Sequence, residues 1–178
     1  GDMSPGWTSP DDIAVDPYTT DYGFPGDGRA VHVGAPTTDE LNGSTTVVLT
    51  LTGQHYASSR ITNFRVVVDS LTSAPDGTMF LFRGQGDTPM GGVGFDISKN
   101  ALDARIMKSD NEVSTDRYLD HHNVTVKKDE DEPPGFRALI IAPPDSDLKY
   151  HFQFTFDNGK SQDVYNNGQS FRLVTYPA

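Results

Sequence analysis

The feature that most constrains the fold is a stretch of strict alternation at residues 148–156. Every second side chain in it is a large aromatic one: Tyr150, Phe152, Phe154 and Phe156. Because successive side chains of a strand point to opposite faces, the pattern predicts a strand with one buried aromatic face. The Asn-Gly pair at residues 158–159 follows at once and predicts a type I′ hairpin turn. Asn166-Asn167-Gly168 repeats that turn signal.

Shorter segments of the same kind precede this strand. Residues 45–53 and 61–71 alternate in the same way. Further strands are expected at 30–34, 78–83, 93–97, 104–108, 123–128, 136–142 and 170–176, with one helical turn or a long loop at 109–122. About ten short strands without a long helix predict an all-β domain of two antiparallel sheets packed face to face, either immunoglobulin-like or jelly-roll-like. A barrel is the alternative.

The length of 178 residues suits a single domain. Residues 1–29 are rich in Pro, Gly and Asp without periodicity, and they predict an extended N-terminal arm before a β-sandwich domain at 30–178. Trp7, the only tryptophan, lies in this arm and either pins it to the domain or offers a stacking platform for a sugar. The alternation predicts these core residues: Val47, Leu49, Leu51, Phe64, Val66, Val68, Leu81, Ile140, Phe152, Phe154 and Phe171.

The charge balance narrows the partners. The chain has 25 acidic and 14 basic residues, a formal net charge of -11, with no cluster of basic residues to offset it. Such a field repels nucleic acid and anionic membranes. No apolar run approaches the ~20 residues of a membrane span, so we expect no membrane insertion. Carbohydrates, cations and other proteins remain as partners.

Motifs of catalysis and metal binding are few. The chain has no cysteine, no Gly-x-Ser-x-Gly elbow, no His-Glu-x-x-His and no P-loop, so we expect no enzyme, although acidic pairs leave a carboxylate-dependent hydrolase open. His121-His122, with Asp116 and Asp120 upstream, is the best candidate for zinc or another divalent ion, but adjacent histidines of a strand point to opposite faces, and a solvated loop is the simpler interpretation. The acidic run at 129–132 is also interpreted as a solvated loop. The single histidines at 32, 55 and 151 are expected at the surface or at the edge of a sheet. No cofactor is expected, and calcium is the one ion that loop carboxylates leave open, with Asp157, Asn158 and Asp163 as further ligands.

The C-terminal segment at residues 135–173 carries one family resemblance. An aromatic residue at Phe136, prolines at 143–144, the strand around Phe152, and the Asn-Gly turns with Phe171 follow one another in order. This rhythm resembles the second half of starch- and glycogen-binding modules of the immunoglobulin-like sandwich type. The resemblance implies that Asn166 and Asn167 bond sugar hydroxyls and that Tyr165 stacks on the sugar ring.

Two functions therefore stand side by side. The first is a noncatalytic carbohydrate-binding module, glucan-binding or lectin-like, with Tyr165, Asn166, Asn167 and Trp7 as the ligand-binding residues. The alternative is a structural or adhesive β-sandwich that binds protein within a secreted or surface assembly. An exposed apolar patch or an unpaired edge strand would favour the second.

Overall fold

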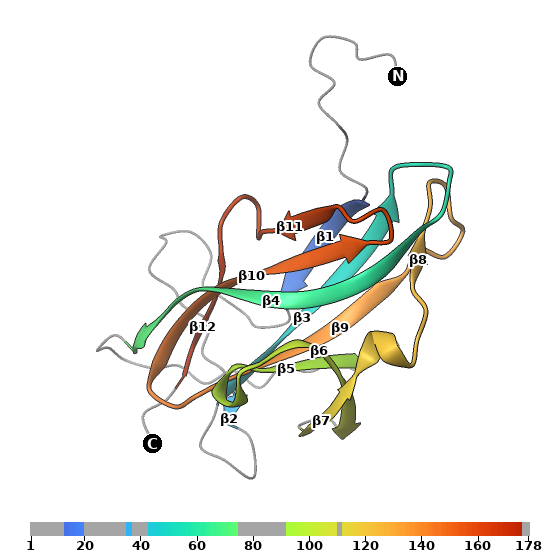
Figure 1. Cartoon of the computed structure of the whole chain (residues 1–178). Helices are drawn as coiled ribbons and strands as arrows, with labels where there is room; N and C mark the ends of the chain where they lie inside the picture. The colour runs from blue at the N-terminus through green and yellow to red at the C-terminus, as the bar shows by residue number, and fades with distance from the viewer. Residues whose placement is uncertain (1–12, 20–34, 37–42, 75–91, 110–111, 176–178) are drawn as a thin grey trace.

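A computed structural model describes residues 13–19, 35–36, 43–74, 92–109 and 112–175, the first two segments as backbone only. These residues form twelve strands and two 3₁₀ turns, η1 (Ile97–Lys99) and η2 (Tyr118–Asp120), and contain no α-helix (Figure 1). The strands are β1 (Ile13–Thr19), β2 (Ala35–Pro36), β3 (Gly43–Gly53), β4 (Ser59–Ser73), β5 (Gly92–Asp96), β6 (Ala101–Ser109), β7 (Glu112–Arg117), β8 (Thr125–Val126), β9 (Gly135–Ala142), β10 (Ser146–Phe156), β11 (Ser161–Val164) and β12 (Phe171–Val174). The prediction of an all-β domain is confirmed.

The strands join into one mixed, curled sheet. Its path runs β1-β3-β9-β5-β6-β4-β10-β11, while β12 pairs with β10, β7 with β6, β2 with β3 and β8 with β4. The link between β6 and β4 is a single pairing, Arg65 with Asp103, so the sheet is weakest there. The prediction of purely antiparallel pairing is wrong at one place, because β5 runs parallel to β9. These two strands are far apart in the chain, which removes the hairpin constraint that forces antiparallel pairing.

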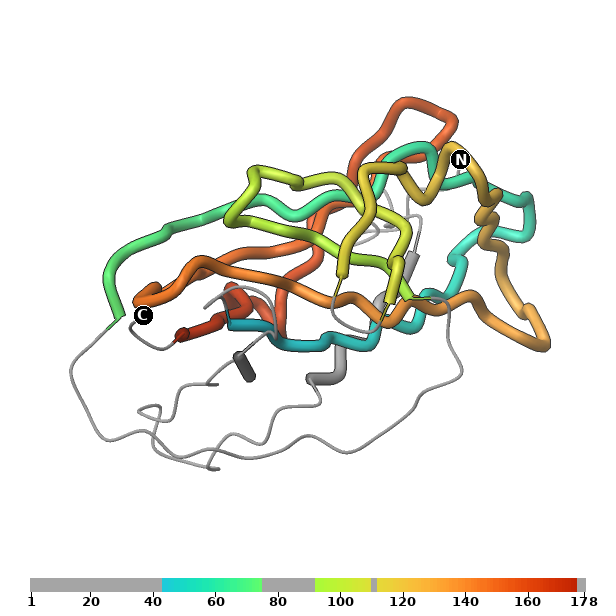
Figure 2. The backbone as a smooth tube through the Cα atoms, turned by 90° about the horizontal axis from the view of Figure 1, so that it is seen from below, coloured from blue at the N-terminus to red at the C-terminus, as the bar shows by residue number. Residues whose placement is uncertain are grey.

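Side chains of β3, β4, β5, β9 and β10 meet in one hydrophobic core. Figure 2 shows the traces of β3 and β4 on opposite sides of the molecule. Phe64 of β4 contacts Phe154 at 4.3 Å between ring centroids, Phe136 of β9 at 4.8 Å and Phe95 of β5 at 5.2 Å. Aromatic pairs at such distances add about 0.5–1.5 kcal/mol each beyond the area they bury.

The predicted core is confirmed wherever it is described. Nine of its members are buried, Val68 is partly buried and packs against them, and Leu81 lies outside the described residues. All four aromatic residues of β10 are buried, as the alternation predicts. The period of 2 therefore fixed the inward face of these strands correctly.

Other local predictions have mixed outcomes. The expected strands at 30–34 and 78–83 lie outside the described residues. Residues 109–122 contain β7 as well as the turn η2, and the N-terminal arm contains β1, which pairs with β3. The β10–β11 turn is not of type I′, because Gly159 has a positive φ of 81° and Asn158 does not. Instead, the Phe156 N–H donates to the Lys160 carbonyl oxygen, so that three residues form the loop. The left-handed residue of this wider loop is Gly159.

Candidate functional site

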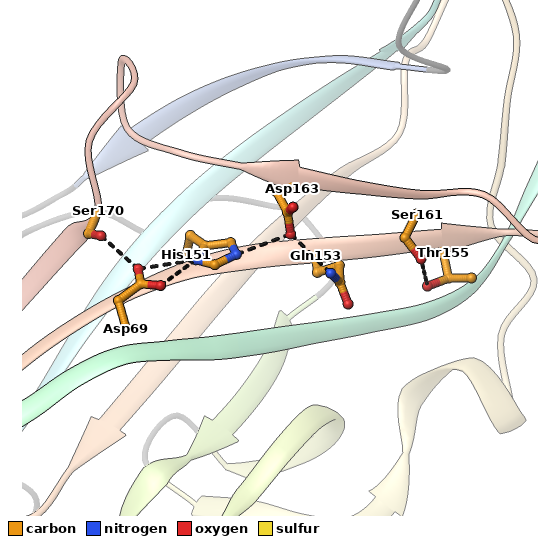
Figure 3. Close-up of polar contacts among 7 residues, drawn as sticks. All are labelled: Asp69, His151, Gln153, Thr155, Ser161, Asp163 and Ser170. Carbon is orange, nitrogen blue, oxygen red and sulfur yellow. Dashed lines mark hydrogen bonds and ion pairs between the residues drawn. The ribbon is translucent and has the colours of Figure 1, made fainter.

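The outer face of β10, opposite the core, carries a group of polar side chains that we call the β10 polar cluster (Figure 3). Its members come from β4, β10, β11 and the segment that joins β11 to β12: Asp69, His151, Gln153, Asp163, Tyr165 and Ser170. His151 is the centre. Along this edge of β10, β11 pairs with residues 152–155 and β12 with residues 147–150, so His151 lies where one partner strand ends and the other begins.

The His151 ring lies between two carboxylates. Its Nδ1 is 2.9 Å from Oδ1 and 3.1 Å from Oδ2 of Asp69, and its Nε2 is 3.1 Å from Oδ1 of Asp163. The imidazolium form donates a hydrogen bond to each carboxylate, whereas a neutral ring turns one lone pair toward an acceptor. Both ring nitrogens thus face carboxylates, and the histidine holds two acids in position.

A β-bulge in β4 brings Asp69 to the ring. Lys149 pairs with Ser70, but the next residue of β10, Tyr150, pairs with Val68, so Asp69 has no partner in the ladder. An extra residue of this kind re-aims a side chain. The expectation that His151 lies at the surface or at the edge of a sheet is therefore wrong, because it is only 6% exposed and belongs to β10, which has β4 on one side and β11 and β12 on the other. Alternation assigns it to the outer face, but the neighbouring strands and the Tyr165 ring cover that face.

Two further hydrogen bonds fix the acids. Ser170 Oγ donates to Oδ2 of Asp69 at 2.6 Å, and Gln153 Nε2 donates to Oδ1 of Asp163 at 3.0 Å. Both bonds of Asp163 thus use the same oxygen, Oδ1. Its side chain is 48% exposed, which leaves Oδ2 available to a ligand donor.

Tyr165 covers the imidazole. The two rings stack with centroids 4.3 Å apart and planes 23° apart, and the tyrosine remains 41% exposed. Since one ring face lies on His151, the exposed area belongs to the opposite face and the ring edge. Loss of hydration, followed by the negative charges of Asp69 and Asp163, raises the pKa of the Tyr165 phenol. The phenol is therefore neutral and able to donate a hydrogen bond at physiological pH.

The turn after Tyr165 is the tight one that the sequence predicts. Asn166 and Gln169 exchange two backbone hydrogen bonds, of 2.7 and 3.1 Å. Asn167 and Gly168 between them both have positive φ, 51° and 82°, as a type I′ turn requires. The Asn167 side chain is exposed and Asn166 is half-buried. Their turn connects Tyr165 and Ser170, two members of the cluster. Trp7 lies outside the described residues.

The proposed metal ligands are not brought together. Within the described ranges, no three histidine, aspartate or glutamate side chains gather where they could hold a metal ion. His122 stacks on Tyr118 at 4.2 Å, and Asn158 Oδ1 accepts the Lys160 N–H at 2.9 Å. Asp163 is engaged with His151. Calcium at the acidic run or the hairpin stays a prediction.

Sequence reasoning missed most of the cluster. Of its members, the sequence marks Tyr165 as a sugar-binding residue and Asp163 only as a calcium ligand. It does not bring Asp69, His151 and Ser170 together, because their proximity depends on a bulge and on two partner strands. One signal is present: His151 lies on a strand whose other face carries four aromatic side chains. Such a strand is central, and polar groups on a central strand need partners.

The comparisons with known proteins add no relative. No protein-family model, no curated protein and no solved structure matches the chain. A separate observation concerns membranes: no helix among the described residues is long and apolar enough to cross one.

Proposed function

We propose that this domain is a noncatalytic carbohydrate-binding module whose ligand, a neutral glucan, binds at the β10 polar cluster. The observation that carries the proposal is the Tyr165 ring, which is backed by His151 and exposed on its other face. Sugar rings place their C–H faces on aromatic planes of this kind. A platform that is already held in place loses little conformational freedom when the ligand binds.

Polar groups around the ring suit vicinal hydroxyls. Asp163 Oδ2 can accept a hydrogen bond from a sugar hydroxyl, and the Asn167 amide can both donate and accept. The acidic character of the chain, with a net charge of -11, disfavours anionic ligands on this face and is indifferent to a neutral sugar. Because both nitrogens of His151 face carboxylates, the cluster supports binding and orientation more than acid–base catalysis.

We further propose that the curled sheet forms two packed layers, β4–β10 over β9–β5, as in an immunoglobulin-like sandwich. The contacts of Phe64 with Phe136 and of Phe152 with Phe95 support this layering. The outer face of the long β10 strand would then be the surface that binds the ligand.

The test is a titration of the protein with maltooligosaccharides, in which isothermal titration calorimetry measures binding and thermal shift measures the melting temperature. A ligand that binds only the folded protein raises the melting temperature by mass action. We expect Tyr165→Ala to abolish the effect and Tyr56→Ala to preserve it, because Tyr56 is equally aromatic and 72% exposed but lies in the β3–β4 loop.

A second variant separates the amide from the turn. Asn167→Gly removes the side chain but retains positive φ without strain, so the hairpin keeps its shape. We expect this variant to bind glucan about 5–10-fold more weakly, the loss of one or two hydrogen bonds. No binding of any maltooligosaccharide or arrayed glycan would contradict the proposal and favour the protein-binding alternative.

A further inference from the structure

A hollow lies on the outer side of β9, away from the β10 polar cluster. Arg137 and Leu139 of β9 line it and point away from the core. We call it the β9 hollow. Its volume is about 420 Å³, which falls in the range of small-molecule sites. The side chains that characterise its wall are Met107, Lys108, Tyr118, His122, Arg137 and Leu139.

Two glycines of β5 shape this region: Gly92 lies in the wall of the hollow, and Gly94 lets neighbouring side chains pack closely beside it. Gly92 is the Cα partner of Arg137 in the parallel pair and contributes no side chain above it. A Cβ at Gly94 would collide with the Val113 and Met107 side chains, so only glycine lets the β6–β7 hairpin lie against β5. The hollow is thus built by the backbone and by close packing.

Cationic groups line it in a chain that is otherwise acidic. Arg137 Nε is buried without a hydrogen-bond partner, and no carboxylate of the described residues forms an ion pair with its guanidinium. Lys108 pairs with Glu112 at 3.4 Å, but both side chains are more than half exposed, so this pair is weak and exchangeable. Among the described residues Arg137 therefore has no carboxylate partner, and a cation in this state in a partly dehydrated site attracts an anion.

The rest of the wall is apolar or aromatic. Tyr118 stacks on His122 with ring centroids 4.2 Å apart, and its other contact is with buried Phe136. Burial raises the pKa of the Tyr118 phenol, which therefore stays neutral and does not repel an anion. Met107 adds a polarisable side chain that adapts to aromatic shapes. The wall suits a ligand with an apolar body and one charged end.

We propose that the β9 hollow binds a small organic oxyanion, a carboxylate or phosphate carried on an apolar or aromatic body. The oxyanion pairs with Arg137 and Lys108, and the body lies against Tyr118 and Met107. A small ligand fits better than a polyanion, because the field of a chain with net charge -11 repels extended nucleic acid. This site is separate from the β10 polar cluster and does not depend on the glucan proposal.

The experiment is an NMR titration of the ¹⁵N-labelled full chain with phenyl phosphate, benzoate, inorganic phosphate and benzyl alcohol. We expect phenyl phosphate or benzoate to shift the amides of residues 92–93, 107–108 and 137, and the neutral alcohol to bind at least about fivefold more weakly, since it lacks the charge that pairs with arginine. Which of the two anions binds more tightly distinguishes phosphate from carboxylate ligands. Inorganic phosphate that binds as tightly as phenyl phosphate would contradict the organic part of the proposal.

Variants locate the charge. Arg137→Met keeps the aliphatic length and removes the guanidinium, and we expect about tenfold weaker binding, the loss of a hydrogen-bonded charge. Lys108→Met tests the same charge effect on an exposed side chain that folding does not need. Arg60→Met, an exposed arginine of β4 outside the hollow, is the matched control and should bind normally. Unchanged binding in both Arg137→Met and Lys108→Met, or shifts at residues 163–168 instead, would overturn the proposal.

Discussion

Two outer surfaces of this domain differ in whether their charged groups have partners. In the β10 polar cluster, the carboxylates of Asp69 and Asp163 share the two nitrogens of one buried histidine. In the β9 hollow, the guanidinium of Arg137 has a buried nitrogen without a partner. The difference comes from the neighbouring strands. A bulge in β4 adds a carboxylate beside His151, whereas the residues paired with Arg137 are Gly92 of β5 and Val48 of β3, neither of which has a polar side chain.

One rule of strand pairing explains both the β10 polar cluster, whose charged groups have partners, and the β9 hollow, whose arginine Nε has none among the described residues. Side chains of paired residues share a face, so the partner strand decides whether a polar group is satisfied. The cluster is expected to contribute to stability as well as to binding, because its acids are held in place. The hollow is expected to contribute to binding alone.

The largest effect is expected from displacing the β6–β7 wall of the hollow. Gly94→Val would push its side chain into Val113 and Met107 and displace the β6–β7 hairpin. We expect the free energy of unfolding, measured in urea, to fall by about 1–3 kcal/mol, as for other overpacked sites. Phenyl phosphate binding should disappear while glucan binding persists.

Gly92→Ala is the control for that variant. A Cβ there would meet only ordinary contacts, at 3.7 Å from Met107 Cγ and 4.0 Å from the Arg137 carbonyl oxygen. Stability should change little. A Gly94→Val variant with the stability and phenyl phosphate affinity of the unmodified chain would show that this glycine does not shape the hollow.

The next effect belongs to His151. His151→Leu removes the donor that separates two carboxylates and leaves both without their partner in a partly buried place. We expect a loss of about 1–3 kcal/mol in the free energy of unfolding, the cost of unsatisfied polar groups. Lys149→Ala, exposed on the same strand and face, should cost less than about 0.5 kcal/mol. Equal costs in the two variants would refute the structural role of the histidine.

A smaller effect is expected at Ser170. Its hydroxyl donates to Asp69 at 2.6 Å, and Ser170→Ala should cost about 1 kcal/mol in urea unfolding, because the acceptor is charged. Thr155 and Ser161 share a neutral hydrogen bond of 2.9 Å on the same face, so Ser161→Ala should cost less. The reverse order would mean that Asp69 finds other donors when Ser170 is absent.

Much of the fold was predictable because alternation reports burial directly. Val47, Leu49 and Leu51 are fully buried, as are the aromatic residues of β10. What the pattern could not give is which strands pair. The parallel β5–β9 pair depends on contacts between distant segments. The strand β7 pairs with its neighbour β6, but it reads Glu-Val-Ser-Thr-Asp-Arg, with only one apolar side chain, so alternation does not mark it.

The candidate site was predictable only at its turn. Asn167 and Gly168 announce positive φ by their residue types, and Tyr165 precedes them. Asp69 lies 82 positions from His151, and no local signal marks the bulge that joins them. Arg137 looks like an ordinary outward residue of an alternating strand. Its Nε lacks a hydrogen-bond partner among the described residues because the residues paired with Arg137 are Gly92 of β5 and Val48 of β3, which the sequence does not place beside it.

The smallest effect is a pH dependence that contrasts two arginines. Arg172 donates to both oxygens of Asp147, at 2.9 and 2.6 Å. These hydrogen bonds, and then the charge of Arg172, hold the pKa of Asp147 below its usual value of 3.8, although burial acts in the opposite direction. Because the folded pKa is the lower one, the stabilisation is fully present above pH 3.8 and is lost as the pH falls through the folded pKa.

Urea midpoints at pH 5 and pH 3 measure this contribution. Arg172→Gln should lower stability at pH 5 and should lose less than the unmodified chain on going to pH 3, because its Asp147 no longer gains from ionisation. The effect is modest, since both side chains are partly open to solvent, which screens the pair. Arg137→Met should leave the acid dependence unchanged, because no described carboxylate pairs with Arg137. A change in acid dependence of the same size in both variants would mean that Arg137 has a carboxylate partner after all, and the contrast between the filled cluster and the open hollow would fail.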